Sequence, residues 1–295
     1  MTELLQSLVR GLGSGSVYAL LAIGLVIIYK SMGVISFAQP AFMMVGATLV
    51  SHFVLQMNFF LAVLVGLGLT ALLGVGIERV ALRPMIGKPV FVLAIITLGI
   101  DIVVRTVTSI FIGLEIRQMG DPWGLKQTEL FGVTVDQRQL ATLVTTLVVV
   151  AGLFAFFRYS RMGLAMRATS YDQEVALAQG VSVGAVFALS WAIAGALAGL
   201  AGVFLSIGVG LEQTLWVTAL KALPVIILGG LDSLGGAVVA GLSIGVFEAL
   251  VGTYGADIAP FLGGDFFLVV PYLLMLLVLL VRPYGLFGTR EVERI

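Results

Sequence analysis

The chain has 295 residues, of which 60% are hydrophobic and only 11% are charged. A water-soluble domain carries about 25% charged residues, so this composition excludes a soluble globular protein and indicates an integral membrane protein. The net charge of zero argues against an electrostatic nucleic-acid binder, and the absence of cysteine excludes disulfides and thiolate metal sites.

A membrane-spanning helix needs about 20 predominantly apolar residues. Segments of this kind predict an all-α membrane protein, a polytopic bundle of eight or nine transmembrane helices. The first segment follows no basic leader and is expected to remain as a membrane helix. The segment 219–231 is short and contains Lys221 and Pro224, which predicts a half-helix or a broken span. The predicted segments are 12–29, 34–55, 59–77, 90–111, 140–157, 184–206, 219–231, 236–253 and 266–281.

The positions of Lys and Arg predict how the chain is oriented. Ten basic residues can share one side of the membrane and four the other, and the richer side is the cytoplasm. The loop 112–139 is then outside, and with nine crossings the N-terminus is outside and the C-terminus inside. The cytoplasmic set is Lys30, Arg79, Arg83, Lys88, Arg158, Arg161, Arg167, Arg282, Arg290 and Arg294, and the outer set is Arg10, Arg117, Lys126 and Arg138.

A charged stretch from Arg158 to Gly180 separates two apolar segments. Small and apolar residues recur in it at helical spacing, which predicts an amphipathic helix at the cytoplasmic membrane surface. Such a helix offers a surface to a soluble partner. The residues at this spacing are Leu164, Ala168, Tyr171, Val175 and Ala178.

A few ionisable residues lie within the apolar segments, where such residues are functional candidates. Asp101 and Arg105 are four apart and share a helix face, so we expect a mutually neutralising pair facing the bundle interior, with a functional role as the alternative. Lys221 and Glu248 are too few and too scattered in sequence for a proton relay. The single histidine, His52, makes no metal site without partners.

Signs of enzyme chemistry are weak. No GxxxxGK[ST] stretch is present, so any ATP hydrolysis that drives the protein belongs to other subunits. Gly241 to Gly245 matches GxSxG, but it lies inside an apolar helical run and lacks a base, so it indicates helix packing and not a hydrolase. We therefore expect a chain that is not an enzyme.

Six motifs in order resemble the permease subunits of branched-chain amino acid ABC importers, the LivH-like family. The resemblance covers nearly the whole chain and implies a single permease domain over residues 1–295. The motifs are GSVYALLAIGLVIIY, FAQPAFMMVGA, ERVALRPMIGKPVFVLAIITLGI, RMGLAMRATSYDQEVALAQGV, KALPVIILGGLDSLGGAVVAGLSIGVFE and RPYGLFG.

The resemblance also implies partners and a coupling loop, 158–180. Glu174-Val175-Ala176, followed after three residues by Gly180, resembles the EAA-xxx-G motif that docks on the ATPase in ABC importers. The family implies a bacterial cytoplasmic membrane, a second homologous permease (a different one, with a homodimer left open), two ATP-binding subunits that hydrolyse ATP, and an extracytoplasmic solute-binding protein. The residues assigned to ATPase coupling are Arg161, Gly163, Arg167, Ala168, Asp172, Glu174, Ala176 and Gly180.

The chain departs from the family where Asn-Phe-Ala-His-Gly is usual, since Ser36-Phe37-Ala38-Gln39-Pro40 stands there. The proline removes a hydrogen-bond donor and fixes the backbone. The transported solute is thus a branched-chain amino acid or another small polar solute, such as urea or a short amide. The alternative is an ion-coupled secondary transporter or facilitator that works alone. Polar residues in apolar spans are the candidate translocation path, namely Gln39, Thr97, Ser206 and Glu248.

Overall fold

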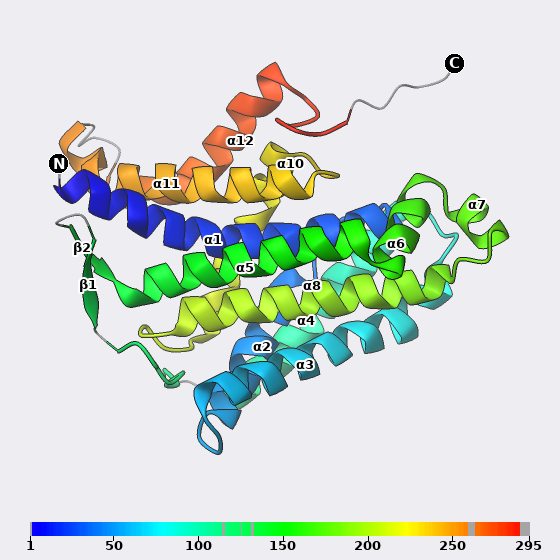
Figure 1. The fold of residues 1–295 in the computed structure, drawn as a ribbon, viewed down its shortest axis with the longest axis horizontal. Helices are drawn as coiled ribbons and strands as arrows, with labels where there is room; N and C mark the ends of the chain where they lie inside the picture. The colour runs from blue at the N-terminus through cyan, green and yellow to red at the C-terminus, as the bar shows by residue number, and fades with distance from the viewer. Residues whose placement is uncertain (1, 114–115, 125, 131–132, 259–262, 290–295) are drawn as a thin grey trace. The chain divides into compact units, whose positions relative to one another are not determined.

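The computed structural model describes residues 2–113, 116–124, 126–130, 133–258 and 263–289. Arg290 and Arg294 of the predicted cytoplasmic set lie outside these residues. Helices dominate the described chain (Figure 1), which packs as two compact units. Unit 1 consists of Met1–Val26, Trp123–Thr146 and Leu220–Ile295, and unit 2 consists of Ile27–Pro122 and Leu147–Ala219.

Among the described residues, six helices are long and apolar enough to cross a membrane. Large apolar side chains on several of them, such as Phe91, Ile110 and Val148, are exposed, as expected for surfaces that face lipid. This confirms a polytopic membrane bundle. The six helices are α1 (Thr2–Met32), α3 (Phe59–Ile77), α4 (Val90–Ile112), α5 (Gln137–Tyr159), α8 (Val183–Ser206) and α11 (Leu234–Ile258).

The predicted spans 34–55 and 219–231 are shorter helices in the structure. Helix α2 (Gln39–Phe53) has 15 residues, with Pro40 in its first turn, so it is shorter than a full crossing needs. The segment around Pro224 is broken as predicted. It forms a 3-10 turn, η3 (Gln213–Leu215), then α9 (Trp216–Ala219) and α10 (Ala222–Gly229). The last predicted span forms η5 (Phe266–Val269) and α12 (Val270–Val281).

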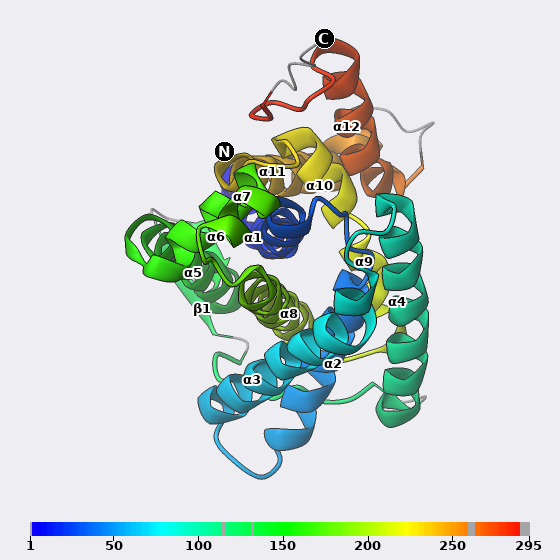
Figure 2. The ribbon, with the colours of Figure 1, turned by 90° about the vertical axis from the view of Figure 1, so that its right-hand side faces the viewer.

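In unit 2, α2, α3 and α8 pack through glycines. A Cβ on Gly46 would overlap the backbone of Gly199, and a Cβ on Gly202 would overlap the backbone of Met43. Small residues let helix backbones approach this closely in a membrane. The Trp191 ring of α8 packs edge-on against Phe42 of α2, with 5.9 Å between ring centroids, and both side chains are buried. Figure 2 shows α8 strongly foreshortened and α3 running obliquely across the view, with α2 next to α3.

In unit 1, α1 runs beside α11 (Figure 1). A Cβ on Gly11 would come within 2.6 Å of Val246 Cα, and one on Gly15 within 2.8 Å of Leu242 Cα. The short α10 turns back onto α11, where Gly229 meets Gly236. Glycine spacing therefore sets the close packing in both units.

Two features do not follow from the sequence prediction, a hairpin in the outer loop and a change of helix type after α3. The predicted outer loop contains an antiparallel hairpin of β1 (Gln127–Leu130) and β2 (Val133–Asp136), in which Gln127 pairs with Asp136. The β-branched residues of Val133–Asp136 favour this conformation. The all-α prediction thus fits the apolar segments and misses the hairpin. After α3 the chain continues as a π-helical turn, η1 (Glu78–Leu82), and a 3-10 turn, η2 (Arg83–Met85).

Candidate functional site

The predicted coupling loop forms two short helices, α6 (Arg161–Tyr171) and α7 (Gln173–Ala178), and not one amphipathic helix. Asp172 is the reason for the break. Its backbone is extended, and its carboxylate Oδ1 accepts hydrogen bonds from the backbone N–H groups of Glu174 and Val175, at 2.9 and 3.0 Å. Aspartate is a favoured N-cap, so the residue that begins α7 also ends α6.

The residues assigned to ATPase coupling differ in exposure. Arg161, Arg167, Asp172, Glu174 and Gly180 are exposed, Ala168 is half-buried, and Gly163 and Ala176 are buried. Leu164, Tyr171 and Val175, three of the residues that recur at helical spacing, are exposed, Tyr171 at 92%. We call the exposed side chains of Leu164, Tyr171, Val175 and Leu177 the apolar loop surface.

The loop is attached to the spans of unit 2 by specific contacts. Gly163 packs on the backbone of Phe156 and Phe157 in α5, where a side chain would overlap main-chain atoms. The Gln173 side-chain amide donates to the carbonyl oxygen of Ser31 at 3.2 Å. These contacts attach α6 to the end of α5 and α7 to the end of α1.

A partly buried ion pair that the sequence did not predict lies where the loop enters α8. The Arg83 guanidinium binds both carboxylate oxygens of Glu78 at 3.0 Å and donates to the carbonyl oxygen of Gly184 at 2.8 Å. Glu78 is fully buried. The five-residue spacing of the pair gives no signal in an α-helical pattern, and the π-helical turn brings the two side chains together.

The predicted pair of Asp101 and Arg105 is confirmed, with 3.3 Å between Arg105 Nη2 and Asp101 Oδ2. Asp101 also has a second partner, because its Oδ1 accepts the backbone N–H of Ala41 at 2.9 Å. Arg105 stacks over the Trp216 ring at 4.0 Å from the centroid. The pair therefore neutralises itself, as expected, and in addition binds the first turn of α2.

The four candidate path residues fall into two kinds. Thr97 Oγ1 accepts the N–H of Phe37 at 3.0 Å, and the carboxylate of Glu248 has protein partners. Gln39 and Ser206 are buried, and neither the Gln39 amide nor the Ser206 hydroxyl has a hydrogen-bond partner in the described structure. Most buried polar groups in proteins are hydrogen-bonded, so these two need an explanation.

Lys221 and Glu248 form a buried ion pair in unit 1, which corrects the view that they are scattered. The Tyr18 hydroxyl donates to Glu248 Oε2 at 2.7 Å, and Lys221 Nζ donates to the Tyr18 hydroxyl at 3.2 Å. Tyr18 is buried and lies in the middle of α1. The three residues come from α1, the start of α10 and α11, and their distance in sequence hid the cluster.

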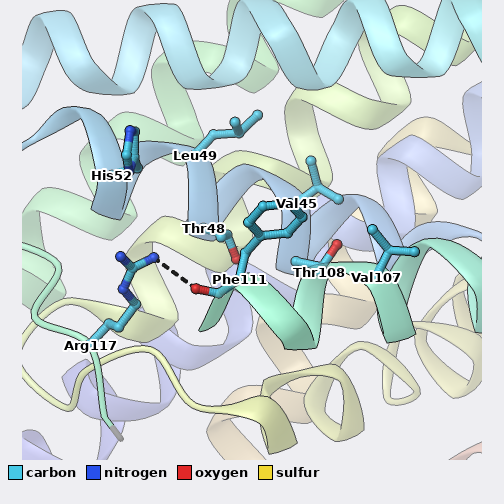
Figure 3. A pocket seen from close by; sticks show the side chains of 8 residues that line it. All are labelled: Val45, Thr48, Leu49, His52, Val107, Thr108, Phe111 and Arg117. Atoms are coloured by element: carbon cyan, nitrogen blue, oxygen red, sulfur yellow. Dashed lines mark hydrogen bonds between the residues drawn. The ribbon is translucent and has the colours of Figure 1, made fainter. Parts of the chain in front are cut away.

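A cavity of about 530 Å³ lies between α2 and α4 of unit 2. Figure 3 shows His52 and Arg117 at one side, with Arg117 donating to the Phe111 carbonyl oxygen. The hydroxyls of Thr48 and Thr108 bond to their own helix backbones, so little polar surface faces the space. His52 lines this cavity, and its Nε2 lies 3.4 Å from the Gln56 side-chain amide.

The comparisons with known proteins agree with these features. The family described as branched-chain amino acid transport system / permease component matches residues 7–279. The permease protein LivH of Escherichia coli K12 is 32% identical, covering 99% of this chain and 97% of that protein. BraD of Pseudomonas aeruginosa is also 32% identical, covering 99% and 98%. Both are described as high-affinity branched-chain amino acid transport system permease proteins.

More distant proteins share the sequence or the fold. A probable LivH permease of Methanocaldococcus jannaschii is 30% identical over 91% of this chain and 88% of that protein. The solved structure of PsaBC from Streptococcus pneumoniae in complex with Fab superposes with a TM-score of 0.52 at 14% identity, covering 96% of this chain and 93% of that one. That likeness supports the fold alone. The full-length sequence match shows that the chain belongs to the family of permease components of branched-chain amino acid transport systems, as a multi-pass transporter subunit and not an enzyme.

Proposed function

We propose that this chain is one of two permease subunits of an ATP-driven importer in a bacterial cytoplasmic membrane. It carries branched-chain amino acids, or a small polar solute related to them, into the cytoplasm. Two ATPase subunits supply the energy, and an extracytoplasmic binding protein delivers the solute. The named relatives support the substrate class, and a second, different permease is the preferred partner, with a copy of this chain as the alternative.

The coupling loop is the observation that carries this proposal. It presents exposed apolar side chains, Tyr171 among them, together with charged Arg167 and Glu174, which is an unusual surface to leave in water. An ATPase that covers the apolar loop surface would bury it. Because Gln173 bonds to the end of α1 and Arg83 bonds to Gly184 beside the loop, a push on α6 and α7 would reach the spans.

A second candidate, an ion-coupled transporter working alone, gains one observation. Ionisable residues do meet inside the spans, since Lys221 and Glu248 form a buried pair with Tyr18. Such groups mark ion pathways in many transporters. The pair is fully compensated, however, and this reading leaves the apolar loop surface without a role. An ATP-driven importer gives the apolar loop surface a role and needs no ion-binding site at the compensated pair.

Reconstitution separates the two candidates. The isolated chain in liposomes should move no solute against its gradient under an imposed proton or sodium gradient. Adding the ATPases, the partner permease and a loaded binding protein should start uptake that vanadate inhibits. Uptake by the isolated chain under an ion gradient would establish the secondary transporter instead.

Gly180 provides the matching variant test. Its φ is +81°, in the left-handed region that asparagine and aspartate tolerate better than other side chains. Gly180→Asp should abolish ATP-driven uptake with normal membrane insertion, because it would add a charged carboxylate to the predicted docking surface. Gly180→Asn is the control with the same shape and no charge, and it should retain uptake. Equal uptake by both variants would argue against docking at this position.

A further inference from the structure

Helix α2 begins in the middle of unit 2 and not at a membrane surface. Two hydrogen bonds to α4 fix its position: Phe37 N–H donates to Thr97 at 3.0 Å, and Ala41 N–H donates to Asp101 at 2.9 Å. Asp101 is near the centre of α4, which runs from Val90 to Ile112. The first turn of α2 therefore lies at mid-span depth. Short helices that start at this depth line the solute sites of many transporters.

Gln39 is the polar side chain at this helix start that has no partner. It is 2% exposed, and neither its Oε1 nor its Nε2 has a hydrogen-bond partner in the described part of the chain. Burying a polar group without a hydrogen bond costs stability, and an apolar residue of the same size would fill the space without that cost. The amide is explained if a transient ligand supplies the missing partners.

The surrounding charges define what that ligand is. Asp101 and Arg105 neutralise each other, and both oxygens of the Asp101 carboxylate are already engaged. Among the described residues, the ionisable pair at the start of α2 thus offers no uncompensated charge to an ion of one sign. An amide side chain offers two donor hydrogens and one acceptor oxygen. These groups suit a solute that is neutral overall and carries both donors and acceptors.

We propose that Gln39 binds the polar group of the transported solute at mid-membrane depth, and that this solute is a zwitterionic amino acid or a neutral amide. The inference rests on the proposed transport function and specifies its substrate contact. The two solute classes share the same chemistry at Gln39, and the experiment below distinguishes them.

The test uses the purified full-length chain and two variants that each remove one unpartnered buried polar group. Gln39→Met keeps the length of the side chain and removes the amide. Thr146→Val is the matched control, since the Thr146 hydroxyl is also buried without a partner, in α5. Both variants should unfold at the same or a higher temperature than the wild type when no solute is present. This outcome separates loss of binding from misfolding.

The readout is the rise in unfolding temperature that solutes cause, measured with leucine, acetamide and arginine. Leucine or acetamide should stabilise the wild type and Thr146→Val, arginine should not, and Gln39→Met should lose the shift. In the assembled importer, Gln39→Met should raise KM about tenfold, the effect of losing roughly 1.4 kcal/mol of binding.

Each result has a definite meaning. An unchanged shift in Gln39→Met overturns the inference and leaves the ATP-driven function standing. A shift with acetamide alone supports Gln39 and overturns the branched-chain substrate. The absence of any shift in the wild type, or a shift with arginine equal to that with leucine, also overturns the inference.

Discussion

Asp101 shows how one buried side chain can satisfy two demands. Its carboxylate neutralises Arg105 on its own helix and accepts the Ala41 N–H at the start of α2. The first demand was predicted from the four-residue spacing. The second was not, because it depends on α2 beginning beside the middle of α4, a position that no local pattern specifies.

This double role leads to a graded prediction for stability. Asp101→Ala should lower the free energy of unfolding by roughly 3 kcal/mol, because it leaves the half-buried Arg105 guanidinium without its carboxylate and the Ala41 N–H without its acceptor. Adding Arg105→Ala should restore only part of the loss, since the Ala41 N–H still lacks an acceptor. Asp101→Asn with Arg105→Met should restore more, because asparagine keeps that acceptor.

Thermal unfolding of the purified variants in one detergent measures this series. Equal stability of the two double variants would show that the bond to Ala41 contributes nothing. A double variant that is stable and cannot transport would instead assign the pair a direct role in transport, the alternative left open by the sequence.

At the scale of elements, turn and cap residues decide where helices end. Helical spacing from Leu164 to Ala178 predicted one helix, and Asp172 divides it into α6 and α7. The signal was present in the sequence, because aspartate prefers N-caps to helix interiors. Pro40 likewise marks the true start of α2 within the predicted span 34–55. Hydrophobic runs locate membrane segments well, and cap residues set their limits.

The cap at Asp172 can be tested by two substitutions. Asp172→Ala removes the acceptor for two backbone N–H groups and should destabilise α7 by about 1 kcal/mol. We expect lower ATP-driven uptake with unchanged insertion, because α7 carries Glu174 and Val175. Asp172→Asn keeps a capping oxygen and should retain most uptake. If Asn and Ala variants transport equally, the shape of α7 does not matter for coupling.

The contact between α2 and α8 gives a second test at this scale. A Cβ on Gly46 would overlap the Gly199 backbone, whereas one on Gly68, in α3, meets nothing within 4 Å. Gly46→Ala should therefore lower the unfolding temperature by several degrees. Gly68→Ala should leave it unchanged or raise it, since alanine favours helix by up to about 1 kcal/mol. Similar melting of both variants would contradict the close packing of α2 on α8.

For the whole molecule, the balance of basic residues predicts orientation. The chain has no cysteine, so a single introduced thiol reports its side of the membrane without background. Ser170 in α6 is half-buried, and its hydroxyl donates to the Arg167 carbonyl oxygen within the same helix. Ser170→Cys should react with a membrane-impermeant reagent only after cells are permeabilised. Labelling of intact cells would reverse the predicted topology.

Contacts between distant parts of the chain were the least predictable. The two hydrogen bonds of the Tyr18 hydroxyl span 203 and 230 residues, to Lys221 and Glu248. Sequence periodicity describes one helix at a time. It therefore identifies Lys221 and Glu248 as charges within spans, but it does not predict that the two side chains form an ion pair. The charged stretch 158–180 and each of the six motifs could be recognised because each lies within one continuous stretch of the sequence.

Two of the ion pairs in the described part of the chain join residues within the predicted spans, and they have an electrical consequence. Asp101 with Arg105 in unit 2, and Glu248 with Lys221 in unit 1, each sum to zero charge. A charge that crosses the membrane field gains or loses about 2.3 kcal/mol per 100 mV. A pair that moves together gains nothing. The free energy of a conformational change that moves each pair without separating its charges thus does not depend on the membrane potential. We therefore expect this permease to transport a zwitterion at the same rate in polarised and depolarised vesicles.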